Sequence, residues 1–341
     1  QATRGAELAG NDFLDNHLGA KFEDAHQNVV TDNEFRQSPN EGLLLSASRD
    51  NAVRGNRFVA NYNGVLLEQG ADGNTVSGNR FELQQRAGVH LAQSRGNAVR
   101  DNEAQGNALG IYLLNAERNL VEGNRVRDNA EAGIALRGAT RNTVRDNGAS
   151  GSPRGFDFNA ADDNLLLDNA ASGNEAGILL NTSRGNTVQG NRLEGNQTGL
   201  EMHFSKDNLI KENLAAGQAA GMLVSESSEN IFVSNAVRDN AYGLNLLYAT
   251  ANVIRDNAVR DNAEAGLSLL NFSGQNVLTQ NEVTGNGWGV LLSSSPGNLL
   301  DFNVVRDNAV GLVLHRSGPG TQARGNAIVA HGLGVHLPEV V

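Results

Sequence analysis

Three side chains of this sequence could act as general acids or bases: Asp157, Glu201 and His203. Asp157 and Glu201 occupy the same position of a sequence repeat, and all three residues lie on segments that we expect to stack as strands. Asp157 and Glu201 are two repeats apart, which corresponds to about 9 to 10 Å along such a stack. That is the wide end of the separation at which one carboxyl protonates a leaving group while another activates water. His203 lies two residues after Glu201 and shares its strand face, so we treat all three as candidate catalytic residues.

Polar and aromatic side chains occupy the same two positions in the neighbouring repeats. Counted from the glycine of each repeat, the second and fourth residues are expected to face outward, whereas the first and third face the core. The outward set expected to bind a ligand is His90, Tyr112, Arg137, Asn159, Asn181 and Asn245. The plainer interpretation is that these side chains only face solvent on an exposed sheet.

Candidate metal ligands are few. His315, His331 and His336 cluster towards the C-terminus, but their spacing matches no established metal motif. Met202 and Met222 fall at inward positions, which favours a role in the core. No cofactor is predicted, and calcium and copper remain the ions to test.

A repeat of about 22 to 24 residues must position all of these side chains. Asn51, Asn74, Asn97 and Asn119 begin one series, which continues to Asn298, and a glycine series runs beside it. Within each repeat, apolar and polar residues alternate over short stretches that stop at Asn, Asp-Asn or Gly. Two-residue alternation is typical of strands, and these terminating residues favour turns.

The pattern predicts an all-β fold: a single right-handed parallel β-helix of about 14 coils, with 22–24 residues and three short strands per coil. One domain is expected over residues 1–341. At each corner, equivalent Asn side chains would lie above one another and form hydrogen-bonded ladders. The Asn residues are therefore interpreted as structural, because a buried amide without a partner is costly.

Composition excludes several classes of protein. The net charge of -11 argues against non-specific nucleic-acid binding, which needs a basic surface. No apolar run reaches the roughly 18 residues of a membrane-spanning segment. The absence of Cys excludes disulfides and thiolate metal sites.

The motif Asn-x-Val-x-x-Asn followed by Gly-Ile/Leu-x-Leu resembles the repeat of carbohydrate-binding and sugar-hydrolase β-helices, and within that group the NosD-like periplasmic proteins. The resemblance covers essentially the whole chain and implies the fold more strongly than the function. The segment Gly199-Leu-Glu201-Met-His203 also partly resembles the Gly-Ile-Asp-Pro-His-Asp strand of alginate epimerases. Met202 and Phe204 depart from that strand and put the catalytic role in doubt.

We therefore expect an exported, noncatalytic binding or scaffold protein, periplasmic or extracellular, that contacts a glycan or a partner protein. One alternative is a polysaccharide-active enzyme that uses Asp157, Glu201 and His203, with Arg137 neutralising a uronate. Another, which only the NosD-like resemblance implies, is a periplasmic accessory protein in copper delivery. The terminal segments carry only minimal caps, such as Pro338, so a partner or a second copy is expected to cover at least one solenoid end.

Overall fold

The computed structural model describes residues 3–337, and these residues contain strands but no helix. The expected cap residue Pro338 lies outside this range. No described segment has the length and apolarity of a helix that could cross a membrane. The chain divides into two compact units, Gln1–Ala170 and Ala171–Val341, and β23 (Ala170–Ser172) spans the boundary between them. The prediction of a single domain stays a prediction.

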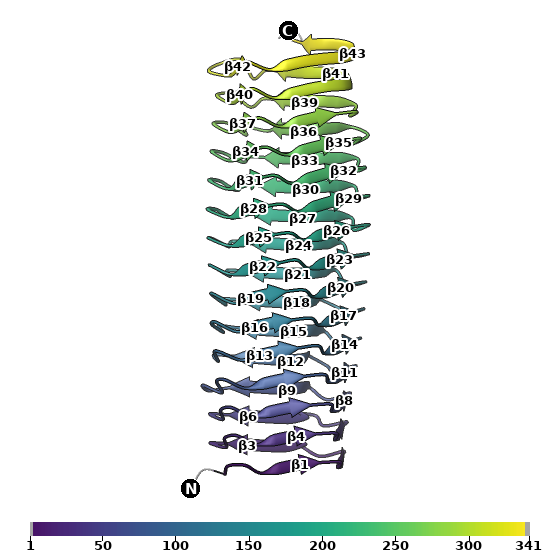
Figure 1. Cartoon of the computed structure of the whole chain (residues 1–341), viewed down its shortest axis with the longest axis vertical. Helices are drawn as coiled ribbons and strands as arrows, with labels where there is room; N and C mark the ends of the chain where they lie inside the picture. Colours follow the sequence, from purple (N-terminus) through teal and green to yellow (C-terminus); the bar gives the residue numbers. More distant parts are fainter. Residues whose placement is uncertain (1–2, 338–341) are drawn as a thin grey trace. The chain divides into compact units, whose positions relative to one another are not determined.

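Each unit is a parallel β-solenoid with three strands in each complete coil, which confirms the predicted fold (Figure 1). We name the three sides of a coil face A, face B and face C, in chain order. Equivalent strands of successive coils pair in parallel, and their residues are 22, 23 or 24 positions apart. This spacing is the period of the sequence repeat.

The strands of the first unit follow this order. Face A contains β1 (Glu7–Ala9), β4 (Val29–Thr31), β7 (Ala52–Arg54), β10 (Thr75–Ser77), β13 (Ala98–Arg100), β16 (Leu120–Glu122), β19 (Thr143–Arg145) and β22 (Leu165–Leu167). Face B contains β2 (Asp12–Leu14), β5 (Glu34–Arg36), β8 (Arg57–Val59), β11 (Arg80–Glu82), β14 (Glu103–Gln105), β17 (Arg125–Arg127) and β20 (Gly148–Ser150). Face C contains β3 (Ala20–Glu23), β6 (Leu43–Ser46), β9 (Asn63–Glu68), β12 (Ala87–Ala92), β15 (Leu109–Leu114), β18 (Ala132–Arg137) and β21 (Arg154–Asn159).

The second unit repeats the arrangement. Face A contains β25 (Thr187–Gln189), β28 (Leu209–Lys211), β31 (Ile231–Val233), β34 (Val253–Arg255), β37 (Val277–Thr279), β40 (Leu299–Asp301) and β42 (Gln322–Arg324). Face B contains β26 (Arg192–Glu194), β29 (Leu214–Ala216), β32 (Ala236–Arg238), β35 (Ala258–Arg260) and β38 (Glu282–Thr284). Face C contains β24 (Ala176–Asn181), β27 (Thr198–His203), β30 (Ala220–Ser225), β33 (Tyr242–Leu247), β36 (Ala265–Leu270) and β39 (Trp288–Ser293), whereas β41 (Val304–His315) and β43 (Ala327–His336) run through faces B and C without a break.

Asn ladders at the corners are confirmed in both units. Asn124 shows the bonding: its Nδ2 donates to Asn147 Oδ1 at 2.9 Å and to the carbonyl of Val99 at 2.9 Å. Its Oδ1 in turn accepts hydrogen bonds from the backbone N and the Nδ2 of Asn102. Each buried amide is thus tied to the next coil and to the backbone of the previous one, which avoids the cost of burying an unpaired polar group.

The core of each coil is filled by the central residue of the short strands and by alternate residues of face C. In the first unit the face B positions carry Phe13, Phe35, Phe58 and Phe81, whose rings stack with centroids 4.6, 4.8 and 4.9 Å apart. Met202 and Met222 are fully buried core residues in the second unit, as their inward positions predict.

Candidate ligand-binding site on face C

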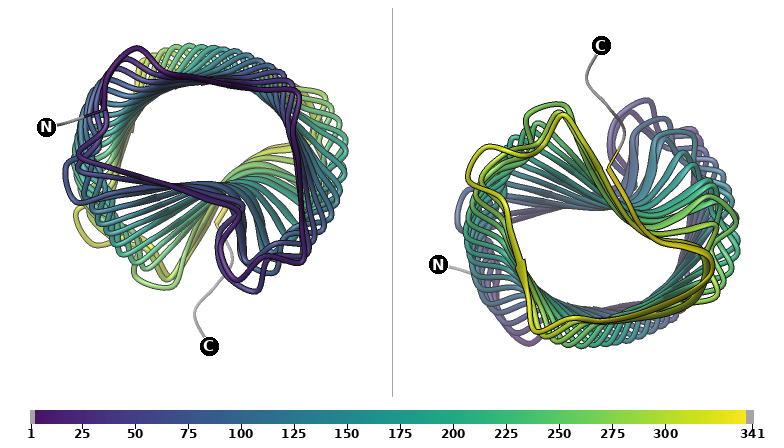
Figure 2. Two further views of the ribbon diagram at one scale, coloured as in Figure 1. Left: turned by 90° about the horizontal axis from the view of Figure 1, so that it is seen from below. Right: turned by 90° about the horizontal axis from the view of Figure 1, so that it is seen from above.

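Face C bends towards the core at one glycine in each coil. At Gly133, an added Cβ would lie 2.7 Å from the carbonyl oxygen of Gly155 and 2.7 Å from the Cγ2 of Val126, a core residue of face B. The same crowding recurs at Gly221, where a Cβ would lie 2.5 Å from the side chain of Val237. In Figure 2 the coils are seen end-on, and one side of each coil bends inward. Only a residue without a side chain fits at this position, and the side chains on either side of it converge on the outer surface.

In the first unit this convergence buries side chains outside the main core. Ala87, Leu109, Ala132 and Ala135 pack with Tyr112 in an apolar cluster, against which Leu114 is partly buried. We call these residues the outer cluster. Simple alternation predicted an open face here, and that expectation is wrong for three candidates, because His90, Tyr112 and Asp157 are each only 3% exposed. Their side chains point away from the core, but the bend places them beneath their neighbours.

Tyr112 is the centre of an aromatic and cationic group. The His90 ring stacks on it with a centroid distance of 4.7 Å and an interplanar angle of 21°. The guanidinium carbons of Arg86 and Arg137 each lie 5.5 Å from the centroid of the Tyr112 ring. Arg86 also lies 6.0 Å from the ring of Tyr62. We call Tyr62, Arg86, His90, Tyr112 and Arg137 the Tyr112 site.

His90 is a neutral side chain at neutral pH. Burial, with a smaller contribution from the charge of Arg86, lowers its pKa to about 3. Neither ring nitrogen has a hydrogen-bond partner in the structure. A buried imidazole without partners is unfavourable, and it leaves an unused donor and an unused acceptor beside Tyr112.

Asp157 follows the Tyr112 site on the next strand of face C. Burial raises the pKa of its carboxyl, and the charges of Arg154 and Arg137 oppose that shift. Arg154 Nη1 lies 3.4 Å from Asp157 Oδ2. Asn159, on the same strand, is exposed and pairs in register with Arg137.

The remaining acid–base candidates lie in the second unit. Glu201 Oε1 and His203 Nε2 are 2.6 Å apart, and both side chains are about one-third exposed or less. Asn181 pairs in register with His203. Asp157 belongs to the other unit, so the separation expected between Asp157 and Glu201 stays a prediction.

Asn245 is a further candidate in the second unit and lies on the outer side of β33, and Tyr248 follows the end of this strand. Asn245 Oδ1 accepts a hydrogen bond of 2.9 Å from the Ser268 hydroxyl. Tyr248 is exposed and follows β33 at a positive φ of 52°, which bulky side chains rarely adopt.

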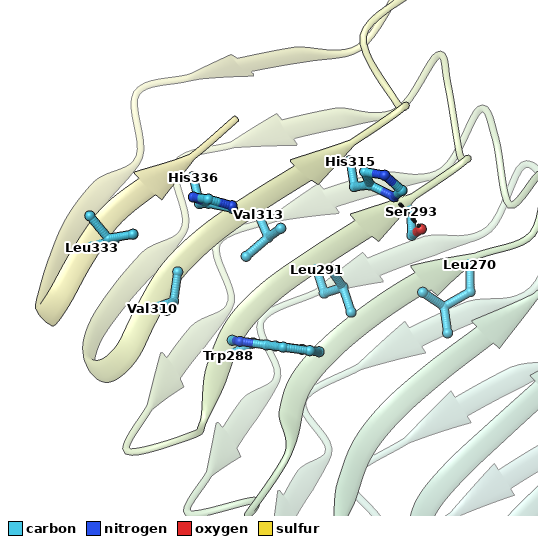
Figure 3. Close-up of a pocket in the computed structure, with 9 residues that line it drawn as sticks. All are labelled: Leu270, Trp288, Leu291, Ser293, Val310, Val313, His315, Leu333 and His336. Carbon is cyan, nitrogen blue, oxygen red and sulfur yellow. Dashed lines mark hydrogen bonds between the residues drawn. The ribbon is translucent and has the colours of Figure 1, made fainter. Parts of the chain in front are cut away.

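A pocket of about 500 Å³ lies on the outer side of face C near the end of the second unit (Figure 3). It is lined by Leu270, Trp288, Leu291, Ser293, Val310, Val313, His315, Leu333 and His336. His315 Nδ1 lies 3.2 Å from the Ser293 hydroxyl. Two of the three histidines suggested as metal ligands therefore share this pocket, whereas His331 is not among the lining residues.

The sequence pattern missed Arg86 and Tyr62. Both precede the face C strand of their coil, at positions that alternation does not assign to a face. The available signal was an arginine directly before Ala87-Gly88, at a position where the two adjacent coils carry Tyr62 and Ala108. The pocket around Trp288 was also not predicted.

Solved structures with the same fold include proteins that act on or bind glycans. The A-module of mannuronan C-5 epimerase AlgE4 from Azotobacter vinelandii is 15% identical, with a TM-score of 0.63 over 92% of this chain and 88% of that chain. The Dettilon tailspike protein is 15% identical, with a TM-score of 0.66 over 78% of this chain and 62% of that chain. A tailspike mutant of the Escherichia coli bacteriophage HK620, solved with a hexasaccharide, is 11% identical, with a TM-score of 0.60 over 94% and 69% of the two chains. At these identities the similarity establishes the fold alone.

Family membership rests on the sequence itself. A comparison with curated protein sequences finds no match. The family model described as periplasmic copper-binding protein (NosD) matches residues 2–98, 74–202, 139–250 and 196–340, which together cover almost the whole chain. The repeat, the Asn ladders and this match agree, and the chain belongs to the NosD family of periplasmic β-helix proteins.

Proposed function

We propose that this protein is a noncatalytic, periplasmic glycan-binding β-helix, and that the outer side of face C is the surface that contacts the sugar chain. The main support for the proposal is the Tyr112 site, where two guanidinium groups lie over an aromatic ring and an unpaired imidazole, both packed against the buried outer cluster. Binding sites for small ligands combine apolar surface with a few well-placed polar groups.

The structural neighbours support a glycan as the ligand. Their names include an epimerase of mannuronan and a tailspike bound to a hexasaccharide. The family supports the periplasmic location. Because fold does not determine function, the chemistry of face C and a direct binding measurement must carry the proposal.

A glycan array followed by titration calorimetry tests this function. The protein should bind a subset of glycans on the array, and Arg137→Ala should weaken binding to the best of them. Arg54→Ala is the matched control, since Arg54 is exposed at the end of β7 on face A. Failure to bind any glycan, or equal weakening by both substitutions, would contradict a role for face C in glycan binding.

A polysaccharide-active enzyme is the second candidate, and the contact between Glu201 and His203 favours it. A carboxylate 2.6 Å from an imidazole can orient the ring and stabilise its protonated form during general base catalysis. Glycan turnover that Glu201→Gln abolishes, with binding retained, would support this function. Binding without chemical change of the glycan supports the noncatalytic function.

The NosD family is described as copper-binding. Copper sites in proteins use groups of His, Met or Cys ligands. In residues 3–337 no group of three or more His, Cys, Asp or Glu side chains is placed to hold a metal ion, and both Met side chains are buried in the core. The described residues do not fit a copper site, so no step in the proposed function uses copper.

A further inference from the structure

Arg86 is a cation held in place by aromatic rings instead of by a carboxylate. Its guanidinium group lies 5.5 Å from the ring of Tyr112 and 6.0 Å from that of Tyr62. Among the described residues, no Asp or Glu forms an ion pair with it. Stacking on rings restrains a guanidinium group and leaves its N–H groups free to bind an anion.

Arg137 brings a second positive charge to the same ring. It lies 5.5 Å from the Tyr112 centroid, and its ion-pair partner is Glu131 at 3.5 Å. The Glu131 side chain is 54% exposed, so solvent screens this pair and its net stabilisation is small. Two guanidinium groups therefore meet over one tyrosine in a chain with a net charge of -11, which makes this site complementary to an anion.

The residues around the two arginines indicate which kind of ligand bears the anionic group. Tyr112, over which both guanidinium groups lie, packs in the buried outer cluster, so the accessible apolar surface of the site is the Tyr62 ring, which is 37% exposed. His90 is 3% exposed, stacks on Tyr112, and has neither ring nitrogen bonded. A ligand for this site should combine an anionic group, an apolar ring face and hydroxyl groups that can pair with an imidazole.

We propose that Arg86 and Arg137 form a subsite for the carboxylate of a hexuronate residue in an acidic glycan. The subsite rests on the proposed glycan-binding function and adds the chemical class of the glycan. The planar guanidinium group presents two parallel N–H donors that match a carboxylate, and a ring carboxylate bound there brings the sugar face next to the exposed Tyr62 ring. The His90 ring is placed to bond a sugar hydroxyl once ligand binding moves the covering side chains.

The sulfate group of a sulfated sugar shares the negative charge of a carboxylate, so the experiment includes both. The intact protein is titrated by calorimetry with an oligogalacturonate, with the same oligomer after reduction of its carboxyl groups, and with a sulfated galactan oligomer of equal length. The variants are Arg86→Gln and Arg137→Gln, with Arg125→Gln as the matched control. Arg125 is exposed on β17 of face B and belongs to the same unit.

The expected result is binding of the oligogalacturonate and at least about tenfold weaker binding of the reduced oligomer. Each of Arg86→Gln and Arg137→Gln should weaken oligogalacturonate binding by about tenfold, and the double variant should bind both oligomers with similar affinity. Arg125→Gln should bind as the parent protein does. Circular dichroism spectra that match the parent would exclude unfolding as the cause of the losses.

Three outcomes would overturn the subsite, and they separate it from the broader function. Equal binding of the acidic and reduced oligomers would remove the carboxylate subsite and leave glycan binding intact. Preference for the sulfated oligomer over the oligogalacturonate would show an anion site that does not select carboxylates. Failure to bind any glycan, here and on the array, would overturn the proposed function and the subsite together.

Discussion

His90 links the stability of the first unit to pH. Its pKa in the folded protein is about 3, mainly because burial disfavours the charged ring, whereas an unfolded histidine titrates near 6.5. Between these values the unfolded chain binds the additional proton. The stability that neutral His90 provides is therefore complete above about pH 6.5 and is lost as the pH falls towards 3, at about 1.4 kcal/mol per pH unit.

His90→Phe should remove this dependence. Phe keeps the ring stack on Tyr112 and removes the two unpaired nitrogens, so the variant should also be about 1 kcal/mol more stable at neutral pH. Urea unfolding of the parent and the variant at several pH values between about 7.5 and 4.5 measures both effects. A free-energy difference between the two proteins that does not change with pH would contradict the assignment.

Asp157 makes the stability of the folded protein depend on pH in the opposite direction. Burial raises the pKa of its carboxyl above the unfolded value, so the stability that its protonated form provides is present at low pH and is lost as the pH rises through the folded pKa. Asp157→Asn cannot lose a proton, and it should flatten this part of the pH profile. Its unfolding free energy, measured over the same pH series, should increase relative to that of the parent protein as the pH rises. A gain that grows instead as the pH falls would show that the charged carboxylate is the form stabilised by Arg154 and Arg137.

At the scale of the coil elements, the Asn ladder carries much of the local stability. Asn124→Leu should cost about 1 to 3 kcal/mol, because Asn102 and the carbonyl of Val99 lose their buried partners. Arg127→Ala, three residues later and exposed on face B, should cost well under about 1 kcal/mol. Chemical denaturation of the two variants makes the comparison, and equal costs would contradict the structural role assigned to the ladder.

The glycine of face C offers a second comparison within one unit. Gly133→Ala would place a methyl group 2.7 Å from a carbonyl oxygen and from the side chain of Val126, so backbone and core must both shift. Gly148→Ala meets no atom within 4 Å and should change stability by less than about 1 kcal/mol. The first substitution should lower the unfolding free energy by about 2 kcal/mol or more, as judged from urea midpoints. Similar midpoints for the two variants would show that face C can relax away from the core.

The coil and the stacking of equivalent residues in successive coils could be predicted from the sequence, but the burial of side chains on the outer side of face C could not. Identical turn chemistry every 22 to 24 residues is enough to specify the period, the ladders and the inward residues such as Ile134 and Leu136. Alternation assigns each side chain to one side of a flat strand, whereas the bend at Gly133 makes the outer side of face C partly enclosed. Arg86 was missed for a related reason. It lies between strands, and its side chain contacts Tyr112 in the next coil, which alternation within one strand does not predict. The catalytic roles of Asp157, Glu201 and His203 stay predictions.

At the scale of the whole molecule, a chain made of stacked coils should respond to damage locally. Each coil pairs only with its neighbours, so stability is expected to be a sum of coil terms and nearest-neighbour terms. Gly133→Ala disturbs the coil that contains β18 and its contacts with the neighbouring coils. The added methyl group meets the carbonyl of Gly155 on β21, so the effect on local opening should be largest at β18 and β21 and should decrease along the sequence in both directions.

Hydrogen exchange followed by mass spectrometry can measure this decrease. In Gly133→Ala, peptides covering β18 and β21 should exchange faster than in the parent, whereas peptides from β4 or β36 should be unchanged. The matched variant Gly148→Ala should leave all of these peptides as they are. A uniform increase throughout residues 3–337 would instead mean that the chain opens as one cooperative unit. That result would contradict the nearest-neighbour description and would favour the single domain predicted from the sequence.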